Sequence, residues 1–316
     1  MSGPTAAAFQ AWLRKQPGYE DATVRALDPV DGGASNVMLR AALADAPLAA
    51  VALRLQSERG IFEPYDVIRE AAVLRHLAAS TVPVPEVLGE EPDRAVLGAL
   101  FLVMEWVDAP HMGAAGAGAS FGAYAAMVAR IHALDWRALG LDLLGVPTSA
   151  AAATRAELEV VAARMVRFPG ADVPLLQRAL DLLRGHVPGG GALALCQGDI
   201  NVFNYLVRAG EVVAVVDWEQ ARIGDPRSDV AQLLALAHLK GAPFGPPGDA
   251  PFVRAYEGAA QVELRGMEFF RARWLFELGV IYHGWLAFNE SEPWYSWELL
   301  VQLLERALAE VEAGVA

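Results

Sequence analysis

The sequence predicts an α+β fold with two lobes, a small β-rich lobe over residues 1–108 and a larger, mostly helical lobe over residues 109–316. Two observations carry this prediction. Short apolar runs separated by turns fill residues 20–108, whereas apolar residues recur at helical spacing from about residue 120 onward. Glycine and proline gather over residues 109–118, which makes that segment the expected linker.

The composition narrows the class of protein. Of the 316 residues, 54% are apolar and 20% are charged, which is typical of a compact globular chain. The formal net charge of −13 argues against partners that are nucleic acids or anionic membranes, because both require a basic face. The single cysteine, Cys196, excludes an internal disulfide. Residues 1–15 lack a secretory pattern, and no segment is apolar enough to span a membrane, so we expect a soluble, cytoplasmic protein.

The first lobe is predicted to alternate strands with one helix. Residues 36–42 and 48–55 form paired strands around a turn, and residues 99–107 form a buried strand. Between them, the apolar positions of residues 66–79 recur at helical spacing.

The second lobe is predicted to be helical with one β-rich island. Residues 205–208 and 211–216 form a tight hairpin, and Asp225-Pro226 begins the helix that follows it, since Asp caps helices and Pro suits their first position. Six further segments have a helical period: residues 121–134, 154–167, 175–186, 253–263, 267–288 and 294–311.

Three polar residues flank this hairpin. Asp199 and Asn204 precede its first strand, and Asp217 follows its second strand. Because both ends of a hairpin meet at its open end, we expect the three side chains to converge. Two carboxylates and an amide make a hard-oxygen site, which suits Mg²⁺ held together with substrate phosphates.

The same residues carry a resemblance to a known family. Asp199-x-x-x-x-Asn204, then Val-Asp-Trp-Glu around Asp217, then Gly-Asp-Pro-x-x-Asp ending at Asp229, resembles the aminoglycoside phosphotransferase/choline kinase family. The resemblance implies a two-lobed, protein-kinase-like fold and transfer of the γ-phosphate of ATP or GTP to a hydroxyl of a small molecule. Asp199 would be the catalytic base, and Asn204 and Asp217 would hold Mg²⁺. Gln197 stands where the family usually has histidine.

The resemblance also assigns a nucleotide site to residues 1–108. Arg54 stands on a strand where kinases place the phosphate-binding lysine, and its guanidinium can grip phosphate or carboxylate oxygens. Glu70 lies on the apolar face of the next helix, and Arg54 is its expected partner. The backbone of Glu105, Trp106 and Val107 would meet the adenine edge. The loop that would cover the phosphates comprises Gly32, Gly33, Ala34, Ser35 and Asn36.

Several residues keep two interpretations. Asp229 either braces the catalytic loop or stabilises a helix N-terminus, and Glu219 lies either near the metal or in a solvated loop. His132 is expected to pack and form hydrogen bonds. The aromatic residues between Trp274 and Trp297 are core or flank an acceptor, and the acidic residues there, Glu277 among them, are an acceptor wall or solvated helix faces.

A rival function is a non-catalytic nucleotide-binding scaffold or sensor of the pseudokinase type. Gln197 and Arg54 favour it, whereas the retained Asp199, Asn204 and Asp217 argue against it. A protein kinase is disfavoured because the next helix starts at Asp225, only eight positions after Asp217, which is too close for an activation segment. Antibiotic, choline-like, sugar, hydroxyacyl thioester and amino-alcohol acceptors share this machinery, so the acceptor stays open.

Overall fold

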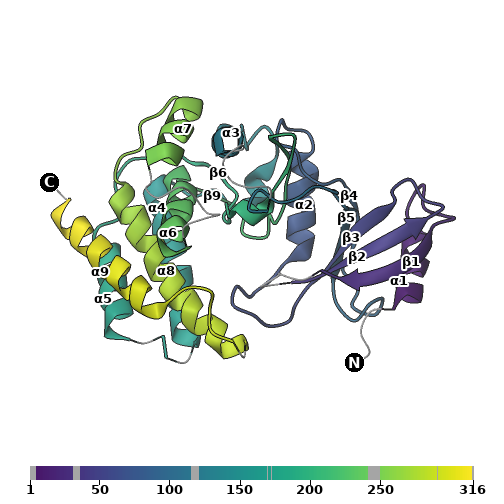
Figure 1. Cartoon of the computed structure of the whole chain (residues 1–316), viewed down its shortest axis with the longest axis horizontal. Helices are drawn as coiled ribbons and strands as arrows, with labels where there is room; N and C mark the ends of the chain where they lie inside the picture. Colours follow the sequence, from purple (N-terminus) through teal and green to yellow (C-terminus); the bar gives the residue numbers. More distant parts are fainter. Residues whose placement is uncertain are drawn as a thin grey trace. The chain divides into compact units, whose positions relative to one another are not determined.

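The computed structural model describes residues 5–30, 36–114, 121–168, 170–171, 173–240, 250–289 and 291–314. The chain divides into two compact units (Figure 1). The N-terminal unit comprises Met1–Asp108 together with Ala214–Glu219. The C-terminal unit comprises Ala109–Val213 and Gln220–Ala316. A short segment around Asp217 thus belongs with the N-terminal unit, although the residues on both sides of it belong to the other.

The N-terminal unit contains a five-stranded antiparallel sheet with strand order β1-β2-β3-β5-β4. The central strand β3 is buried along its whole length, which explains its nearly continuous apolar sequence. Its Arg54 lies opposite Met38 of β2 and Leu102 of β5. The strands are β1 (Thr23–Pro29), β2 (Val37–Ala44), β3 (Ala50–Leu55), β4 (Val87–Glu91) and β5 (Phe101–Glu105).

Two helices cover the sheet, α1 (Ala6–Leu13) and α2 (Val67–Leu77). Trp12 of α1 packs edge-on against Phe101, with ring centroids 5.0 Å apart, and joins the core that includes Leu53. Because side chains alternate along a strand, Arg54 points to the face opposite Leu53. Glu70 of α2 meets it there. Asp66 caps α2 by accepting a hydrogen bond from the Arg69 amide.

In the C-terminal unit, α8 packs against α4, α5, α6 and α9, and α3 packs against α7 (Figure 1). Helix α8 is apolar around most of its circumference, as expected for a helix surrounded by others. The helices are α3 (Phe121–His132), α4 (Ala150–Arg167), α5 (Pro174–Gly185), α6 (Pro226–Lys240), α7 (Ala250–Ala260), α8 (Met267–Phe288) and α9 (Trp297–Ala313). Short 3-10 turns occur at η1 (Leu141–Leu144) and η2 (Val202–Asn204).

Two small sheets frame the loop that carries Asp199. Strand β6 (Ala194–Cys196) pairs antiparallel with β9 (Arg222–Gly224), and β7 (Tyr205–Arg208) pairs with β8 (Glu211–Val215). Gly198 turns the chain between them at a φ of 88°. A Cβ there would lie 2.3 Å from the Gln220 carbonyl oxygen, so this turn requires glycine.

The predicted elements are present, with small shifts at their ends. The helix over residues 267–288 has the predicted bounds, whereas the helix expected from residue 154 begins at Ala150, after the capping hydroxyl of Ser149. The sequence analysis missed α1, β1, β4, β6 and β9. Among the described residues, no helix is both long and apolar enough to cross a membrane.

Candidate active site

Asp199 and Asn204 lie together in the loop between β6 and β7. The amide Nδ2 of Asn204 donates to Asp199 Oδ2 at 2.9 Å and to the Asp199 carbonyl oxygen at 2.9 Å. From α6, Gln232 Nε2 donates to Asp199 Oδ1 at 2.8 Å. Neutral amide donors therefore orient both carboxylate oxygens. The sequence did not predict the contact of Gln232 with Asp199, because nothing in its surrounding pattern sets Gln232 apart from the rest of α6.

The backbone of this loop is fixed by Asp229 of α6. Its Oδ2 accepts hydrogen bonds from the amides of Gln197, at 2.8 Å, and Gly198, at 3.4 Å. Gln197 in turn accepts from the Asp199 amide through its side-chain oxygen, at 3.1 Å. Of the two interpretations of Asp229, bracing of the loop is confirmed. Gln197 is fully buried and takes part in the same network.

His132 of α3 connects this brace to α7. Its Nε2 lies 3.3 Å from Asp229 Oδ2, and its Nδ1 lies 2.7 Å from the Tyr256 hydroxyl. Burial opposes ionisation of Asp229, but contacts with His132 and Arg222 hold its pKa below the ordinary value. The predicted packing and hydrogen-bonding role of His132 is confirmed. Both His132 and Tyr256 line a hollow of about 430 Å³ in the C-terminal unit.

Asp229 also belongs to a network of buried ion pairs that includes residues of α4 and α8. Arg222 Nε lies 2.9 Å from Glu157 Oε1, and Arg222 Nη2 lies 3.5 Å from Asp229 Oδ1. Arg273 joins Glu157, at 3.1 Å, to Glu277, at 2.9 Å. Glu277 is therefore buried in an ion-pair network, so neither interpretation of it, a solvated helix face or an acceptor wall, holds.

The N-terminal unit contains the second charged cluster, centred on Arg54. The guanidinium lies 3.0 Å from Glu70, 2.8 Å from Asp217 and 2.7 Å from Glu219. Arg54 is only 4% exposed, which confirms its predicted pairing with Glu70 and excludes a solvent-facing arginine. Glu219 is also held by Asn36 Nδ2, at 2.7 Å, so the solvated-loop interpretation of Glu219 is wrong. We call Arg54, Glu70, Asp217 and Glu219 the Arg54 cluster.

The Arg54 cluster holds three carboxylates around one guanidinium. Burial, together with the charges of Asp217 and Glu219, raises the pKa of Glu70 to about 7, although Arg54 opposes this shift. Glu70 Oε1 accepts from the Trp218 amide at 3.1 Å, whereas its buried Oε2 has no hydrogen-bond partner among the described residues.

The remaining predicted nucleotide residues are placed as follows. Gly32, Gly33, Ala34 and Ser35 lie outside the described residues, and Asn36 follows them at the start of β2. Glu105 ends β5, and its amide donates to the Glu86 carbonyl oxygen at 2.8 Å. Trp106 lies beneath the Arg40 guanidinium, 5.4 Å from the ring centroid.

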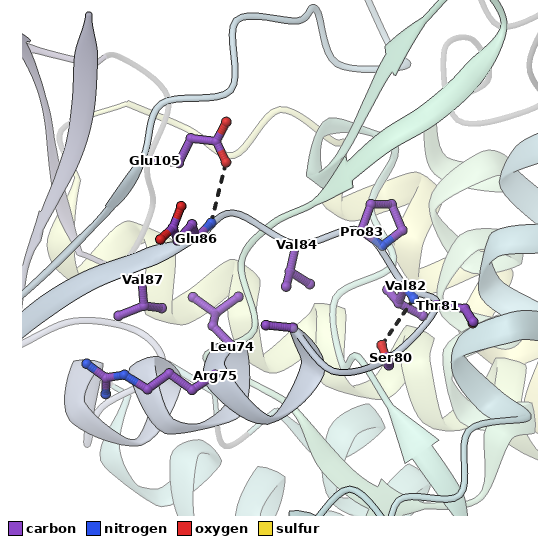
Figure 2. A pocket seen from close by; sticks show the side chains of 11 residues that line it. Leu74, Arg75, Ser80, Thr81, Val82, Pro83, Val84, Glu86, Val87 and Glu105 are labelled. Atoms are coloured by element: carbon purple, nitrogen blue, oxygen red, sulfur yellow. Dashed lines mark hydrogen bonds between the residues drawn. The ribbon is translucent and has the colours of Figure 1, made fainter. Parts of the chain in front are cut away.

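A hollow of about 420 Å³ lies in the N-terminal unit, beside α2 and the segment that precedes β4. Figure 2 shows the side chains that line it. Glu105 lies at its edge, and its carboxylate accepts a long hydrogen bond, 3.5 Å, from the Glu86 amide. Leu74, Val84 and Val87 give it an apolar wall. Of the predicted nucleotide residues, Glu105 alone is among its lining residues.

Comparisons with known proteins identify the family of this chain. The family described as "Phosphotransferase enzyme family" matches residues 26–272. The chain belongs to this family. Asp199, Asn204, Asp217 and Asp229 all fall within the matched segment. Membership makes this chain a phosphotransferase by family, as the resemblance implied.

Curated relatives match over a limited part of their length. Mouse acyl-CoA dehydrogenase family member 10 is 26% identical over 264 residues, which cover 79% of this chain and 23% of the relative. Human acyl-CoA dehydrogenase family member 11 is 27% identical over 178 residues, which cover 53% of this chain and 22% of the relative. The chain thus spans about a quarter of the length of these relatives.

Solved structures confirm the α+β, kinase-like fold class. A putative aminoglycoside phosphotransferase from Ralstonia eutropha superimposes with a TM-score of 0.68 at 22% identity, covering 98% of this chain and 97% of that one. A thermostable mutant of aminoglycoside phosphotransferase APH(4)-Ia, in a ternary complex with ADP and hygromycin B, gives 0.61 at 16% identity, covering 93% and 96%.

Proposed function

We propose that this chain transfers the γ-phosphate of ATP or GTP to a hydroxyl group of a small molecule in a Mg²⁺-dependent reaction. The observation that carries the proposal is the Asp199–Asn204 pair, joined at 2.9 Å on a loop braced by Asp229. Family membership supplies the reaction class. ADP in the related ternary complex supports the use of a nucleotide.

Asp199 is the proposed catalytic base. Gln232 and Asn204 fix the direction of its carboxylate through neutral hydrogen bonds, so its negative charge is retained for the acceptor proton. The acceptor hydroxyl donates to this carboxylate as its oxygen attacks the phosphorus in line. Catalysis is then mainly positioning and charge stabilisation.

Asn204 and Asp217 are the proposed Mg²⁺ ligands. Because Asn204 Nδ2 donates to Asp199, its carbonyl oxygen Oδ1 is the atom left to ligate a metal. A carboxylate and an amide oxygen form a donor set that Mg²⁺ accepts together with phosphates and water. When bound, the ion would offset the charge of the nucleotide phosphates. Asp217 belongs to the N-terminal unit, so its approach to Asn204 remains a prediction.

Residues 1–108 are proposed to bind the nucleotide, and residues 109–316 to bind the acceptor and carry out catalysis. Arg54, oriented by Glu70, would grip phosphate oxygens together with the loop over residues 32–36. Since the Glu105 amide is engaged with Glu86, the backbone of Trp106 and Val107 would supply the donors for adenine.

The proposal is tested by following ADP and GDP release over a panel of acceptors. The panel contains an aminoglycoside and a macrolide, because similar solved structures are named for these substrates. It also contains hydroxyacyl-coenzyme A esters, because the curated relatives are named for acyl-CoA and the proposed reaction requires a hydroxyl group. We expect at least one Mg²⁺-dependent product whose new phosphate ester is visible by ³¹P NMR. Asp199→Asn is the matched control and should abolish that product. Tight Mg²⁺-nucleotide binding without transfer to any acceptor would favour the scaffold or sensor instead.

A further inference from the structure

We propose that Phe203 and His111 form an apolar wall beside the reacting hydroxyl, which selects acceptors that carry an apolar group next to that hydroxyl. The inference rests on the proposed function and adds to it the class of acceptor. Its starting observation is the position of Phe203, one residue before Asn204 and four after Asp199. A large aromatic side chain, 37% exposed, thus stands within the loop that carries the proposed base.

The loop holds Phe203 in a defined place. Phe203 lies in the turn η2, and its amide donates to Asn201 Oδ1 at 3.2 Å. The Val202 side chain before it is buried, and the Asn204 side chain after it binds Asp199. The turn is therefore anchored on both sides of the exposed ring, which limits how far the ring can move.

His111 supports the ring from a separate segment of the same unit. The two rings meet edge-on, with centroids 4.8 Å apart and an interplanar angle of 87°. Gly113 allows this contact, because a Cβ there would lie 2.7 Å from the Phe203 ring. The 110–114 segment is itself anchored, since Met112 N donates to the Tyr205 carbonyl oxygen, and Val207 N to that of Pro110, both at 2.8 Å. The wall is thus built from a fixed turn and a fixed segment.

The charge of this wall disfavours a polycationic acceptor. Within residues 109–114 and 199–204, Asp199 supplies the sole carboxylate. Burial lowers the pKa of His111, so its imidazole is neutral at pH 7. Asp199, which the proposed mechanism engages with the acceptor hydroxyl, is thus the one counter-ion that these two segments offer an ammonium group, whereas an alkyl or aryl group beside Phe203 would gain from leaving water.

A second exposed aromatic surface provides a control. Phe288, 39% exposed, ends α8, and Trp294 lies in the segment before α9. These segments are separate from the loop between β6 and β7 that carries Asp199 and Asn204. If the acceptor bound there, truncating Phe288 rather than Phe203 would change selectivity.

The test compares hydroxyacyl-coenzyme A esters whose chain extends beyond the hydroxyl by one methylene at a time. Activity is measured as kcat/KM, with kanamycin as the polycationic comparator. For the unmodified protein we expect kcat/KM to rise about two- to fourfold per added methylene, the upper value corresponding to full burial. Phe203→Ala should flatten this slope, Phe203→Leu should keep most of it, and Phe288→Ala should leave it unchanged. Structural damage alone would lower every ester by the same factor and leave the slope intact.

The possible outcomes distinguish a failure of this inference from a failure of the proposed function. The proposed wall is wrong if Phe203→Ala leaves the dependence of kcat/KM on chain length intact, or if Phe288→Ala abolishes it. Asp199-dependent phosphorylation of kanamycin without transfer to any ester also overturns it, while the proposed phosphotransferase stands. Absence of transfer to every compound, with nucleotide turnover indifferent to Asp199→Asn, removes the proposed function and the inference together.

Discussion

The two charged sites of the molecule hold their carboxylates in opposite ways. In the Arg54 cluster, a buried guanidinium contacts the carboxylates of Glu70, Asp217 and Glu219. In the C-terminal unit, neutral amides of Gln232 and Asn204 orient the carboxylate of Asp199. Ion pairing neutralises charge, whereas amide hydrogen bonds fix direction and leave the charge in place. The carboxylates of the first site thus share one positive charge, whereas the carboxylate of the second keeps its own charge in a fixed direction.

The two sites also differ in net charge. With every group ionised, one guanidinium and three carboxylates leave the Arg54 cluster with an excess of two negative charges (1 − 3 = −2). The raised pKa of Glu70 is one response to this excess, and a divalent cation at Asp217 would be another. Asp199 needs no such partner to be oriented. We therefore expect substitutions in the first site to alter stability and nucleotide binding, and those in the second to alter turnover.

The largest expected effect is on turnover in Asp199→Asn. The amide keeps the shape of the side chain but cannot accept the proton, so kcat should fall by about 10³-fold or more. Stabilisation by Mg²⁺-nucleotide should persist. Asp135→Asn, at an exposed carboxylate of the same unit, is the control and should leave kcat unchanged. Near-normal turnover in Asp199→Asn would contradict the proposal that the site of Asp199 controls turnover.

The next effect is on stability in Arg54→Met. Removing the guanidinium leaves three carboxylates facing one another in a buried place, which should lower the free energy of unfolding by about 3–5 kcal/mol. Denaturant unfolding measures this loss. Arg94→Met removes an exposed arginine that pairs with Glu58 and should cost less than about 1 kcal/mol. Equal losses for the two variants would contradict the assignment of Arg54 to a buried cluster.

A smaller effect is expected for Asp229→Asn. The substitution removes the charge that binds the Gln197 and Gly198 amides, and a hydrogen bond to a charged group contributes about 1.5–3 kcal/mol. We expect kcat to fall roughly 10- to 100-fold while the Kd for Mg²⁺-nucleotide changes little. Steady-state kinetics and calorimetry check the two quantities separately. A matching loss in nucleotide affinity would show that Asp229 serves more than the loop of Asp199.

The smallest predicted effect is a pH dependence that belongs to Glu70. Its pKa is about 7 in the folded chain, against 4.5 for an ordinary glutamate, so the folded state holds this proton more tightly. The stabilisation is complete below pH 4.5 and is lost as the pH rises toward 7. Glu70→Gln should remove this part of the pH dependence, by about 3 kcal/mol at most. Unfolding curves from pH 5 to 8 that are parallel for both proteins would rule it out.

The sequence predicted best those side-chain contacts for which the motif spacing and the residue types indicate the same role. The Asp199–Asn204 pair, the Arg54–Glu70 pair and the brace by Asp229 all follow from local motifs, and the structure contains all three contacts. The helices were predictable because their apolar residues recur over many turns. Strands β6 and β9, of three residues each, are too short to show any periodicity.

The contacts that the sequence did not predict join residues far apart along the chain. Glu157 and Glu277 appear as ordinary helical glutamates until α4 and α8 pack and bury them together with Arg273. Glu219 joins the Arg54 cluster because a segment following β8 returns to the N-terminal unit, which no local pattern encodes. Gln232 was missed for the same reason, since its partner Asp199 lies more than thirty residues away.

The most direct test of the contrast between the two sites is thermal unfolding with ATP or GTP, with and without Mg²⁺. It compares the unmodified protein with Asp199→Ala and Asp217→Ala. Ligand at about 100 times its Kd stabilises a protein by ~2.7 kcal/mol, which moves the melting temperature by several degrees. We predict a Mg²⁺-dependent shift that survives Asp199→Ala and is lost in Asp217→Ala. A shift lost in Asp199→Ala and kept in Asp217→Ala, or no shift with either nucleotide, would contradict the division between a nucleotide site and a base.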